Sequence, residues 1–222
     1  MSSSGAATTG RPVRVLIVDD HEVLATSLAL VLDDQPDITT VGVAGTIAKA
    51  KALIVTTTPD VVLLDHRLPD GDGVAAIREL RRLRPSAEVV MLTASAADHV
   101  LVAAIEAGAA GFVSKTRGLA DVTAAVRAAA AGEAVISPEL LIRLLPRLQR
   151  GPQAGRSDLT EREREVLGLL AEGLSNAAIA QKLTVSVHTV RNHIANLSAK
   201  LGAHSKLEAL SIAVRDGLLP DL

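Results

Sequence analysis

The sequence has 222 residues, which accommodates one large or two small domains, and its 48% hydrophobic content excludes a chain that is disordered throughout. No apolar run approaches the ~20 residues of a membrane-spanning helix, and the absence of cysteine excludes disulfides and thiolate zinc sites. The formal net charge is only −2, and the single aromatic residue, one Phe, argues against a surface that stacks single-stranded bases. We therefore expect a globular, cytoplasmic protein with no membrane partner.

Short strands alternate with helices over the first part of the chain. Residues 1–10 are small and polar and predict a disordered tail, and residues 11–136 predict the first domain. Runs rich in β-branched residues predict five strands: Val13–Val18, Ile38–Val43, Val61–Leu64, Glu88–Thr93 and Ala110–Val113. Helical spacing predicts five helices: Val23–Leu32, Ile47–Ile54, Val74–Leu83, Asp98–Ala107 and Leu119–Ala131. This alternation is typical of an α/β fold, a doubly wound five-stranded parallel sheet in the flavodoxin-like order 2-1-3-4-5.

The pattern changes after residue 136. Residues 137–157 are apolar and basic, contain Pro146 and end in a stretch rich in Gly and Pro, so they predict an interdomain linker with a partly helical start. Residues 158–222 predict a second, small all-α domain with a helix-turn-helix. Its expected helices are Glu161–Ala171, Asn176–Lys182, Val187–Leu201 and Lys206–Arg215.

Charged and polar residues end four of the predicted strands. In an open parallel sheet, ligands bind beyond the carboxyl ends of the strands, and in the expected order these four strands are neighbours. The residues at these ends are Asp19, Asp20, Asp65, Thr93 and Lys115. Any single Asp at a strand end often serves only as a helix N-cap, but the whole set at successive strand ends favours a functional site.

Three clustered carboxylates repel one another unless a cation joins them, and a site made of oxygen ligands favours Mg²⁺. Asp65 follows the central strand and is therefore the expected nucleophile toward a phosphoryl group. Lys115 is expected to neutralise the phosphoryl oxygens, and Thr93 is placed to donate a hydrogen bond to the product.

One nearby motif suggests a different ligand. Residues 71–76 match the dinucleotide-binding pattern G-x-G-x-x-A. That fingerprint belongs to the first strand-to-helix turn, whereas this stretch follows the third strand. A tight turn before a helix explains Gly71 and Gly73 without a cofactor.

Residues 13–133 resemble the receiver domain of bacterial two-component systems. The resemblance rests on Val18-Asp19-Asp20, Leu64-Asp65, Pro69, Gly73, Thr93-Ala94 and Lys115. It implies that Asp65 is the phosphoacceptor and that Asp19, Asp20, Asp65 and the main-chain carbonyl of Arg67 hold Mg²⁺. It also implies that Thr93, Phe112 and Lys115 serve as the switch hydroxyl, the switch aromatic residue and the phosphate partner. A lone Phe on a strand is otherwise ordinary core.

A one-sided basic surface is the notable feature of the second domain. Residues 173–207 contain no Asp or Glu but contain Lys182, Arg191, Lys200 and Lys206. Ser186 is a favourable N-cap for the third helix of this domain, whose positions Val187, Val190, Ile194, Leu197 and Leu201 would face the core. Arg and Asn on the opposite face suit guanine and adenine in a major groove, and lysines suit phosphates. A generic solvated helix would have the same pattern.

Residues from Leu159 to Gly202 resemble the LuxR-type DNA-binding domain. The matching segments include Leu159–Leu167, Gly173-Leu174-Ser175-Asn176 and Thr189-Val190-Arg191-Asn192-His193. With the receiver they imply the NarL/FixJ class of response regulators. The residues expected to contact DNA are Lys182, Ser186, His188, Thr189, Arg191, Asn192, Ala195, Asn196, Lys200 and Lys206. Ala177 and Ala195 depart from the basic residues that many family members carry there, which puts the base preference in doubt.

The resemblance implies a phosphorylation-controlled transcriptional regulator rather than an enzyme. Its expected partners are a sensor histidine kinase, double-stranded DNA and, when phosphorylated, a second copy that pairs through Leu207, Leu210 and Val214. Inward packing would equally explain that last stripe. Two alternatives are a haloacid-dehalogenase-like phosphatase and a regulator that needs no phosphorylation. Arg67 stands where such phosphatases typically carry a second Asp, and the intact acidic site argues against the other alternative.

Overall fold

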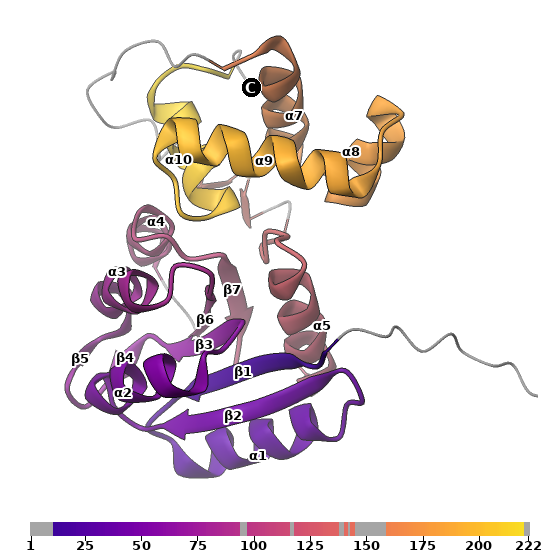
Figure 1. Cartoon of the computed structure of the whole chain (residues 1–222). Coiled ribbons are helices and arrows are strands. Elements are labelled where there is room, and N and C mark those ends of the chain that lie inside the picture. Colours follow the sequence, from indigo (N-terminus) through magenta and orange to yellow (C-terminus); the bar gives the residue numbers. More distant parts are fainter. Residues whose placement is uncertain are drawn as a thin grey trace, which may run out of the picture.

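A computed structural model describes residues 11–93, 97–115, 118–137, 140–141, 143–144 and 159–219 (Figure 1). The predicted tail and most of the predicted linker lie outside the described residues. The strands are β1 Val13–Val18, β2 Ile38–Ala44, β3 Val61–Asp65, β4 Arg67–Leu68, β5 Gly71–Asp72, β6 Glu88–Thr93 and β7 Gly111–Ser114. The helices are α1 Glu22–Asp33, α2 Ile47–Thr57, α3 Gly73–Leu83, α4 Asp98–Glu106, α5 Leu119–Ala130, α7 Glu161–Ala171, α8 Asn176–Leu183, α9 Val187–Leu201 and α10 Lys206–Arg215.

The first domain contains the predicted five-stranded parallel sheet. Its strand order is β2-β1-β3-β6-β7, which confirms the flavodoxin-like order expected from the sequence. In the pairing of β1 with β3, Val15 lies opposite Val61 and Val18 opposite Leu64. The central strand β3 is buried along its whole length, as expected for a parallel strand with helices on both faces.

Alternate residues of each strand enter two separate hydrophobic layers. Val15 and Ile17 of β1 pack with residues of α1 and α5 on one face of the sheet. Leu16 and Val18 pack with residues of α2, α3 and α4 on the other face. These two layers hold the carboxyl ends of β1, β3 and β6 at one edge, where the candidate site lies.

A small antiparallel hairpin follows the central strand. Arg67 pairs with Asp72 and Leu68 with Gly71, so β4 and β5 form a second, two-stranded sheet. The sequence indicates only a tight turn here, because two-residue strands are too short to show an alternating pattern. The side chain of Asp72 then caps α3 by accepting a hydrogen bond from the Val74 N–H at 2.8 Å.

The second domain consists of helices in its described part. The Thr160 hydroxyl and the Glu163 carboxylate form a capping box at the start of α7. Ser186 caps α9 as predicted, since its side chain accepts the Thr189 N–H at 3.0 Å. Val187 was predicted to face the core, and this is wrong: it is 37% exposed, because the first turn of α9 extends beyond the domain core.

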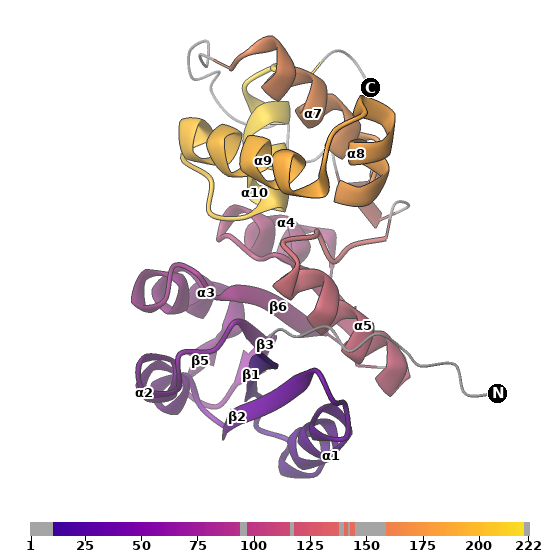
Figure 2. The same ribbon diagram turned by 45° about the vertical axis from the view of Figure 1, so that its right-hand side comes forward.

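The two domains contact each other through α4 and α10, as both views show (Figures 1 and 2). Leu101 and Ile105 of α4 belong to one continuous hydrophobic cluster with Leu207 of α10. The buried Ser205 hydroxyl donates a hydrogen bond to the main-chain carbonyl of Ala109 at 2.9 Å. The described part of the chain contains no helix long and apolar enough to span a membrane.

Candidate functional site

The five predicted residues at the strand ends meet at one edge of the sheet. A cavity of about 460 Å³ is lined by His21, Leu24, Asp65, His66, Arg67, Thr93 and Lys115. Asp19 is 2% exposed and Asp65 is 6% exposed, so both carboxylates are taken out of water. Buried carboxylates need a compensating charge, and the next contacts supply one.

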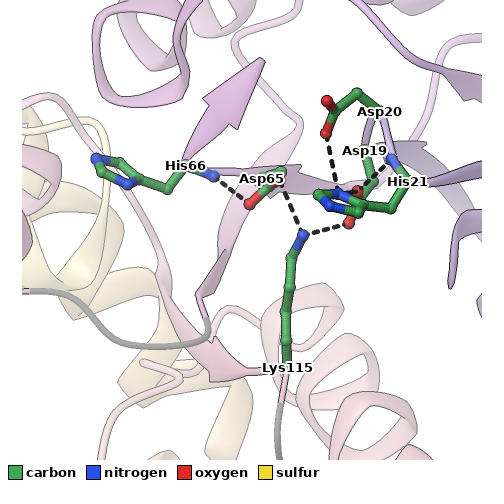
Figure 3. Close-up of polar contacts among 6 residues, drawn as sticks. All are labelled: Asp19, Asp20, His21, Asp65, His66 and Lys115. Carbon is green, nitrogen blue, oxygen red and sulfur yellow. Dashed lines mark hydrogen bonds and ion pairs between the residues drawn. The ribbon is translucent and has the colours of Figure 1, made fainter. Parts of the chain in front are cut away.

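Lys115 bridges the two buried carboxylates (Figure 3). Its Nζ atom lies 2.6 Å from Asp19 Oδ2 and 2.8 Å from Asp65 Oδ2. Burial lowers the pKa of Lys115, but the hydrogen bonds and charges of Asp19 and Asp65 outweigh this and raise the pKa above its ordinary value. Lys115 is therefore a cation at neutral pH, at the position where a phosphoryl group on Asp65 would need one.

The phosphoacceptor candidate is held in a fixed orientation. Asp65 Oδ1 accepts the main-chain N–H of His66 at 2.7 Å, while Oδ2 faces Lys115. Figure 3 shows the His66 side chain pointing away from this carboxylate. The two oxygens thus have separate partners, which fixes the plane of the carboxylate.

His21 is a member of the site that our sequence analysis missed. Its Nδ1 atom lies 3.1 Å from Asp19 Oδ1 and 3.1 Å from Asp20 Oδ1, and its main-chain N–H donates to Asp19 Oδ1 at 2.9 Å. The sequence signal was its position directly after Asp20. A histidine in that position has no strand-end pattern of its own, so only the turn geometry brings it to the carboxylates.

The donor set fits a hard divalent cation. One ligand atom each from Asp19, Asp20, His21 and Asp65 lies within 4.8 Å of the others. The three carboxylates carry three negative charges, which Lys115 and a dipositive ion together would balance, and their oxygens are the ligands that Mg²⁺ prefers. Asp20 is exposed and Arg67 lines the cavity, so this side of the site is open to solvent and to further oxygen ligands.

The predicted switch residues lie beside the acidic site. Thr93 ends β6, and Phe112 lies on β7 with intermediate exposure. Thr93 lines the acidic cavity and also a second cavity of about 590 Å³ that Phe112 lines too. Phe112 packs against the hydrophobic cluster that joins α4 to α10. A structural connection therefore runs from the acidic site to the second domain.

The helix-turn-helix is formed by α8 and α9. Thr184, in the turn between them, adopts a left-handed conformation at φ 54°, and Ser186 then starts α9. Most of the side chains expected to read bases are exposed on one face of α9, namely His188, Arg191, Asn192, Ala195 and Asn196, while Thr189 is partly buried. This face is open for a duplex to approach.

The three lysines expected to contact DNA phosphates form ion pairs within the chain. Lys182 Nζ lies 3.1 Å from Glu172 Oε2, and Lys200 Nζ lies 2.7 Å from Glu163 Oε2. Lys206 instead crosses to the first domain, where its Nζ lies 3.0 Å from the carboxylate of Glu133. The ion pair between Glu133 and Lys206 was not predicted, because the two residues are far apart in the sequence. The DNA contacts of these lysines stay predictions.

The residues expected to pair two copies lie on α10. Leu207 and Leu210 are each 1% exposed and pack in the core of the chain, and Val214 packs partly against the same cluster. Inward packing alone would give this arrangement, so the dimerisation role of the three residues stays a prediction.

Two family models match the chain over these two domains. Residues 15–127 match the response regulator receiver domain, and residues 157–213 match the bacterial regulatory proteins of the luxR family. The chain belongs to the LuxR-type response regulators. The resemblance drawn from the motifs is thereby confirmed, and so is the function: this response regulator is a DNA-binding transcriptional regulator of a two-component system.

Relatives of this response regulator match it over nearly its full length. It is 37% identical to the DNA-binding transcriptional activator DevR/DosR of Mycobacterium tuberculosis, over 90% of this chain and 94% of the relative. It is 34% identical to the transcriptional regulatory protein LiaR of Bacillus subtilis, over 93% and 99% of the two chains. A solved structure of two RcsB dimers bound to two parallel DNAs is 25% identical, with a TM-score of 0.54, over 92% of this chain and 99% of that chain.

Proposed function

We propose that Asp65 accepts a phosphoryl group from a sensor histidine kinase and that this modification controls binding of the second domain to DNA. The observation that carries the proposal is the contact of Asp65 Oδ2 with Lys115 Nζ at 2.8 Å, at the end of the central strand and on an open cavity. A nucleophilic carboxylate and the cation that stabilises its product thus lie together.

The chemistry is a direct phosphoryl transfer. An oxygen of Asp65 attacks phosphorus, the bond from phosphorus to the imidazole nitrogen of the kinase breaks, and its electron pair returns to that nitrogen. The product is an acyl phosphate on Asp65. The ammonium group of Lys115 stabilises the oxygens of the transferred group, and the fixed Asp65 plane reduces the entropy cost of the attack.

Mg²⁺ is the proposed cofactor. The carboxylates of Asp19, Asp20 and Asp65 would hold it, together with the main-chain carbonyl of Arg67. When bound, Mg²⁺ supplies positive charge that offsets the charge of the phosphoryl oxygens. The role of this chain is to gather the three carboxylates, two of which, those of Asp19 and Asp65, contact Lys115.

Double-stranded DNA is the partner of the second domain, and we propose that α9 enters its major groove. The exposed side chains Arg191 and Asn192 suit guanine and adenine there. We also propose that phosphorylated chains form a homodimer, in line with the similarity to RcsB, whose solved structure contains dimers on DNA. Because the DNA is cytoplasmic in a bacterium, the cytoplasm is the proposed compartment.

The proposed role is that of a regulator and not of a phosphatase acting on many substrate molecules. Haloacid-dehalogenase-like phosphatases typically use a second Asp two residues after the nucleophile. In this chain the residue at that position is Arg67, which is exposed and lines the cavity. The side chain available there has no carboxylate to act as the general acid.

The test is labelling with a small-molecule phosphodonor in the presence and absence of Mg²⁺. The wild-type protein should take up one acid-stable, base-labile phosphoryl group, and Asp65→Asn should abolish the uptake. Asp72→Asn is a matched control, because it removes a nearby carboxylate outside the acidic cluster. Labelling of Asp65→Asn at the wild-type level would refute the assignment.

A further inference from the structure

One carboxylate of the first domain contacts the start of a DNA-binding helix. Glu133 follows α5 and reaches the first residue of α8. The main-chain N–H of Asn176 donates to Glu133 Oε1 at 2.9 Å and to Oε2 at 3.2 Å. Lys206 Nζ donates to the same Oε2 atom at 3.0 Å. A single negatively charged group thus accepts hydrogen bonds from two helices of the second domain.

The groups around this carboxylate form a built anion site. The Lys206 side chain is only 8% exposed, and Asn176 is 1% exposed. The Asn176 amide is also part of the cluster, because its Oδ1 atom accepts from Lys206 Nζ at 3.0 Å. Its Nδ2 atom is buried and has no hydrogen-bond partner among the described residues. The site therefore holds one donor that Glu133 does not use.

Electrostatics of the cluster require an anion. Burial lowers the pKa of Lys206, and the charge and hydrogen bond of Glu133 oppose that effect. The positive end of the α8 dipole adds to the positive potential at the Asn176 N–H. Without a negative group in the site, the buried ammonium would lose the partner that stabilises its charge.

The position of the site suggests which anion it takes when the domains separate. The first helix of a helix-turn-helix crosses the DNA backbone, and helix N-termini are common phosphate ligands. Here that helix is α8, and its first N–H belongs to the site. A cavity of about 340 Å³ borders the cluster and is lined by Glu133, Ser175 and Lys206 among others, so the cluster lies at an opening between the domains.

We propose that Lys206 and the start of α8 form a binding site for a backbone phosphate of DNA, and that Glu133 occupies this site as an internal competitor. The proposal rests on the DNA-binding function of the second domain. A phosphodiester has two non-bridging oxygens, as a carboxylate does, and in their tetrahedral arrangement they can replace Glu133 and also engage the unused Asn176 Nδ2. Base-reading residues on α9 stay exposed meanwhile, so Glu133 blocks a backbone contact and leaves the reading face open.

The test measures the affinity of the full-length, unphosphorylated protein for a fluorescently labelled random-sequence duplex at several KCl concentrations. Glu133→Gln removes the competing charge and should tighten binding by roughly 3- to 10-fold, because a larger fraction of molecules then has a free site. Lys206→Ala should weaken binding and flatten the salt dependence by about one unit. Glu133→Gln should add nothing in the Lys206→Ala background.

The matched control is Glu79→Gln. It changes the net charge by the same amount and also breaks a carboxylate–lysine ion pair, with Lys51, within the first domain. Equal gains for Glu79→Gln and Glu133→Gln would attribute the effect to overall charge and overturn the proposal. A gain from Glu133→Gln that persists without Lys206 would show that loosening of the domains exposes other contacts, which also overturns it.

A further experiment distinguishes a DNA phosphate from a free anion as the ligand of this site. Inorganic phosphate is compared with chloride at equal ionic strength. If phosphate raises the melting temperature of Glu133→Gln while the DNA affinity and salt slope are insensitive to Lys206, the site takes free anions only and the proposal fails. If the wild-type protein binds no duplex even with a phosphoryl mimic, the DNA-binding function itself is refuted. If the wild-type protein binds the duplex normally and Glu133→Gln has the same affinity, only the proposed role of Glu133 as a competitor is refuted.

Discussion

Gly73 is the residue at which α3 approaches the strand that carries the phosphoacceptor. A Cβ atom at this position would overlap the main-chain carbonyl oxygen of Asp65. The Gly73 N–H also donates to the His66 carbonyl at 2.9 Å, which fixes the distance between the two segments. This close approach explains the second glycine of the dinucleotide-like pattern without a cofactor.

We predict that Gly73→Ala lowers the free energy of unfolding by about 1–3 kcal/mol, because the added methyl group forces the backbone around Asp65 to move. Phosphoryl uptake at Asp65 should fall in parallel. Gly118→Ala is the control, since a Cβ atom there meets nothing within 4 Å. Thermal unfolding followed by circular dichroism gives the measurement, because the chain has no Trp or Tyr for fluorescence. Equal stability of the two variants would contradict the packing argument.

At the residue scale, sequence prediction succeeds where position along a strand decides the geometry. Asp65 and Thr93 end β3 and β6, Lys115 follows β7, and parallel strands bring their ends to one edge of the sheet. His21 and Glu133 have no such pattern. Their contacts depend on a turn conformation and on how the two domains pack, and neither can be derived from local spacing.

At the scale of elements, the helix α7 is stabilised by a carboxylate with two functions. Glu163 accepts the Thr160 N–H at 2.7 Å and pairs with Lys200 at 2.7 Å. Burial raises the pKa of Glu163, but the hydrogen bonds from Lys200 and Thr160 outweigh it and keep the pKa below the ordinary value of 4.5. The ionised form is therefore favoured in the folded state.

The stabilisation by Glu163 should depend on pH. It is fully present above the unfolded-state pKa of about 4.5 and is lost as the pH falls through the lower folded-state pKa. Glu163→Gln should melt at a lower temperature than the wild type at pH 7, and this difference should shrink as the pH falls below about 4. Glu161→Gln removes an exposed carboxylate from the same turn and serves as control. A difference in melting temperature that is unchanged at pH 3 would contradict the role of the ionised form.

The bounds of helices and strands could be predicted to within a few residues where the hydrophobic pattern extends over the whole element. The bounds of β1, β6, α7, α9 and α10 agree with those expected from the sequence. The β4–β5 hairpin was not predicted, because a strand of two residues is too short to show a periodic pattern. Val187 was assigned to the core because its spacing fits the hydrophobic stripe of α9. Spacing identifies a face of a helix but not where the core ends along it.

At the scale of the whole molecule, a continuous set of contacts joins the acidic site to the second domain. Thr93 and Phe112 border a common cavity next to α4, and α4 packs against α10. Arg81, which is buried in the first domain, donates to the main-chain carbonyl of His204 just before α10. A phosphoryl group on Asp65 can therefore shift the equilibrium between domains in contact and domains apart. The size of the shift is set by the difference in the free energy with which the group interacts with these two states.

The central claim is that the state of Asp65 sets the affinity for DNA. The most direct measurement is duplex binding by the full-length protein with and without beryllofluoride and Mg²⁺, on an operator chosen by selection from random sequences, with sedimentation of the same samples. The account predicts tighter binding and a larger dimer fraction for the wild type and no change for Asp65→Asn. Identical affinity and mass distribution of the wild type in both conditions would contradict it.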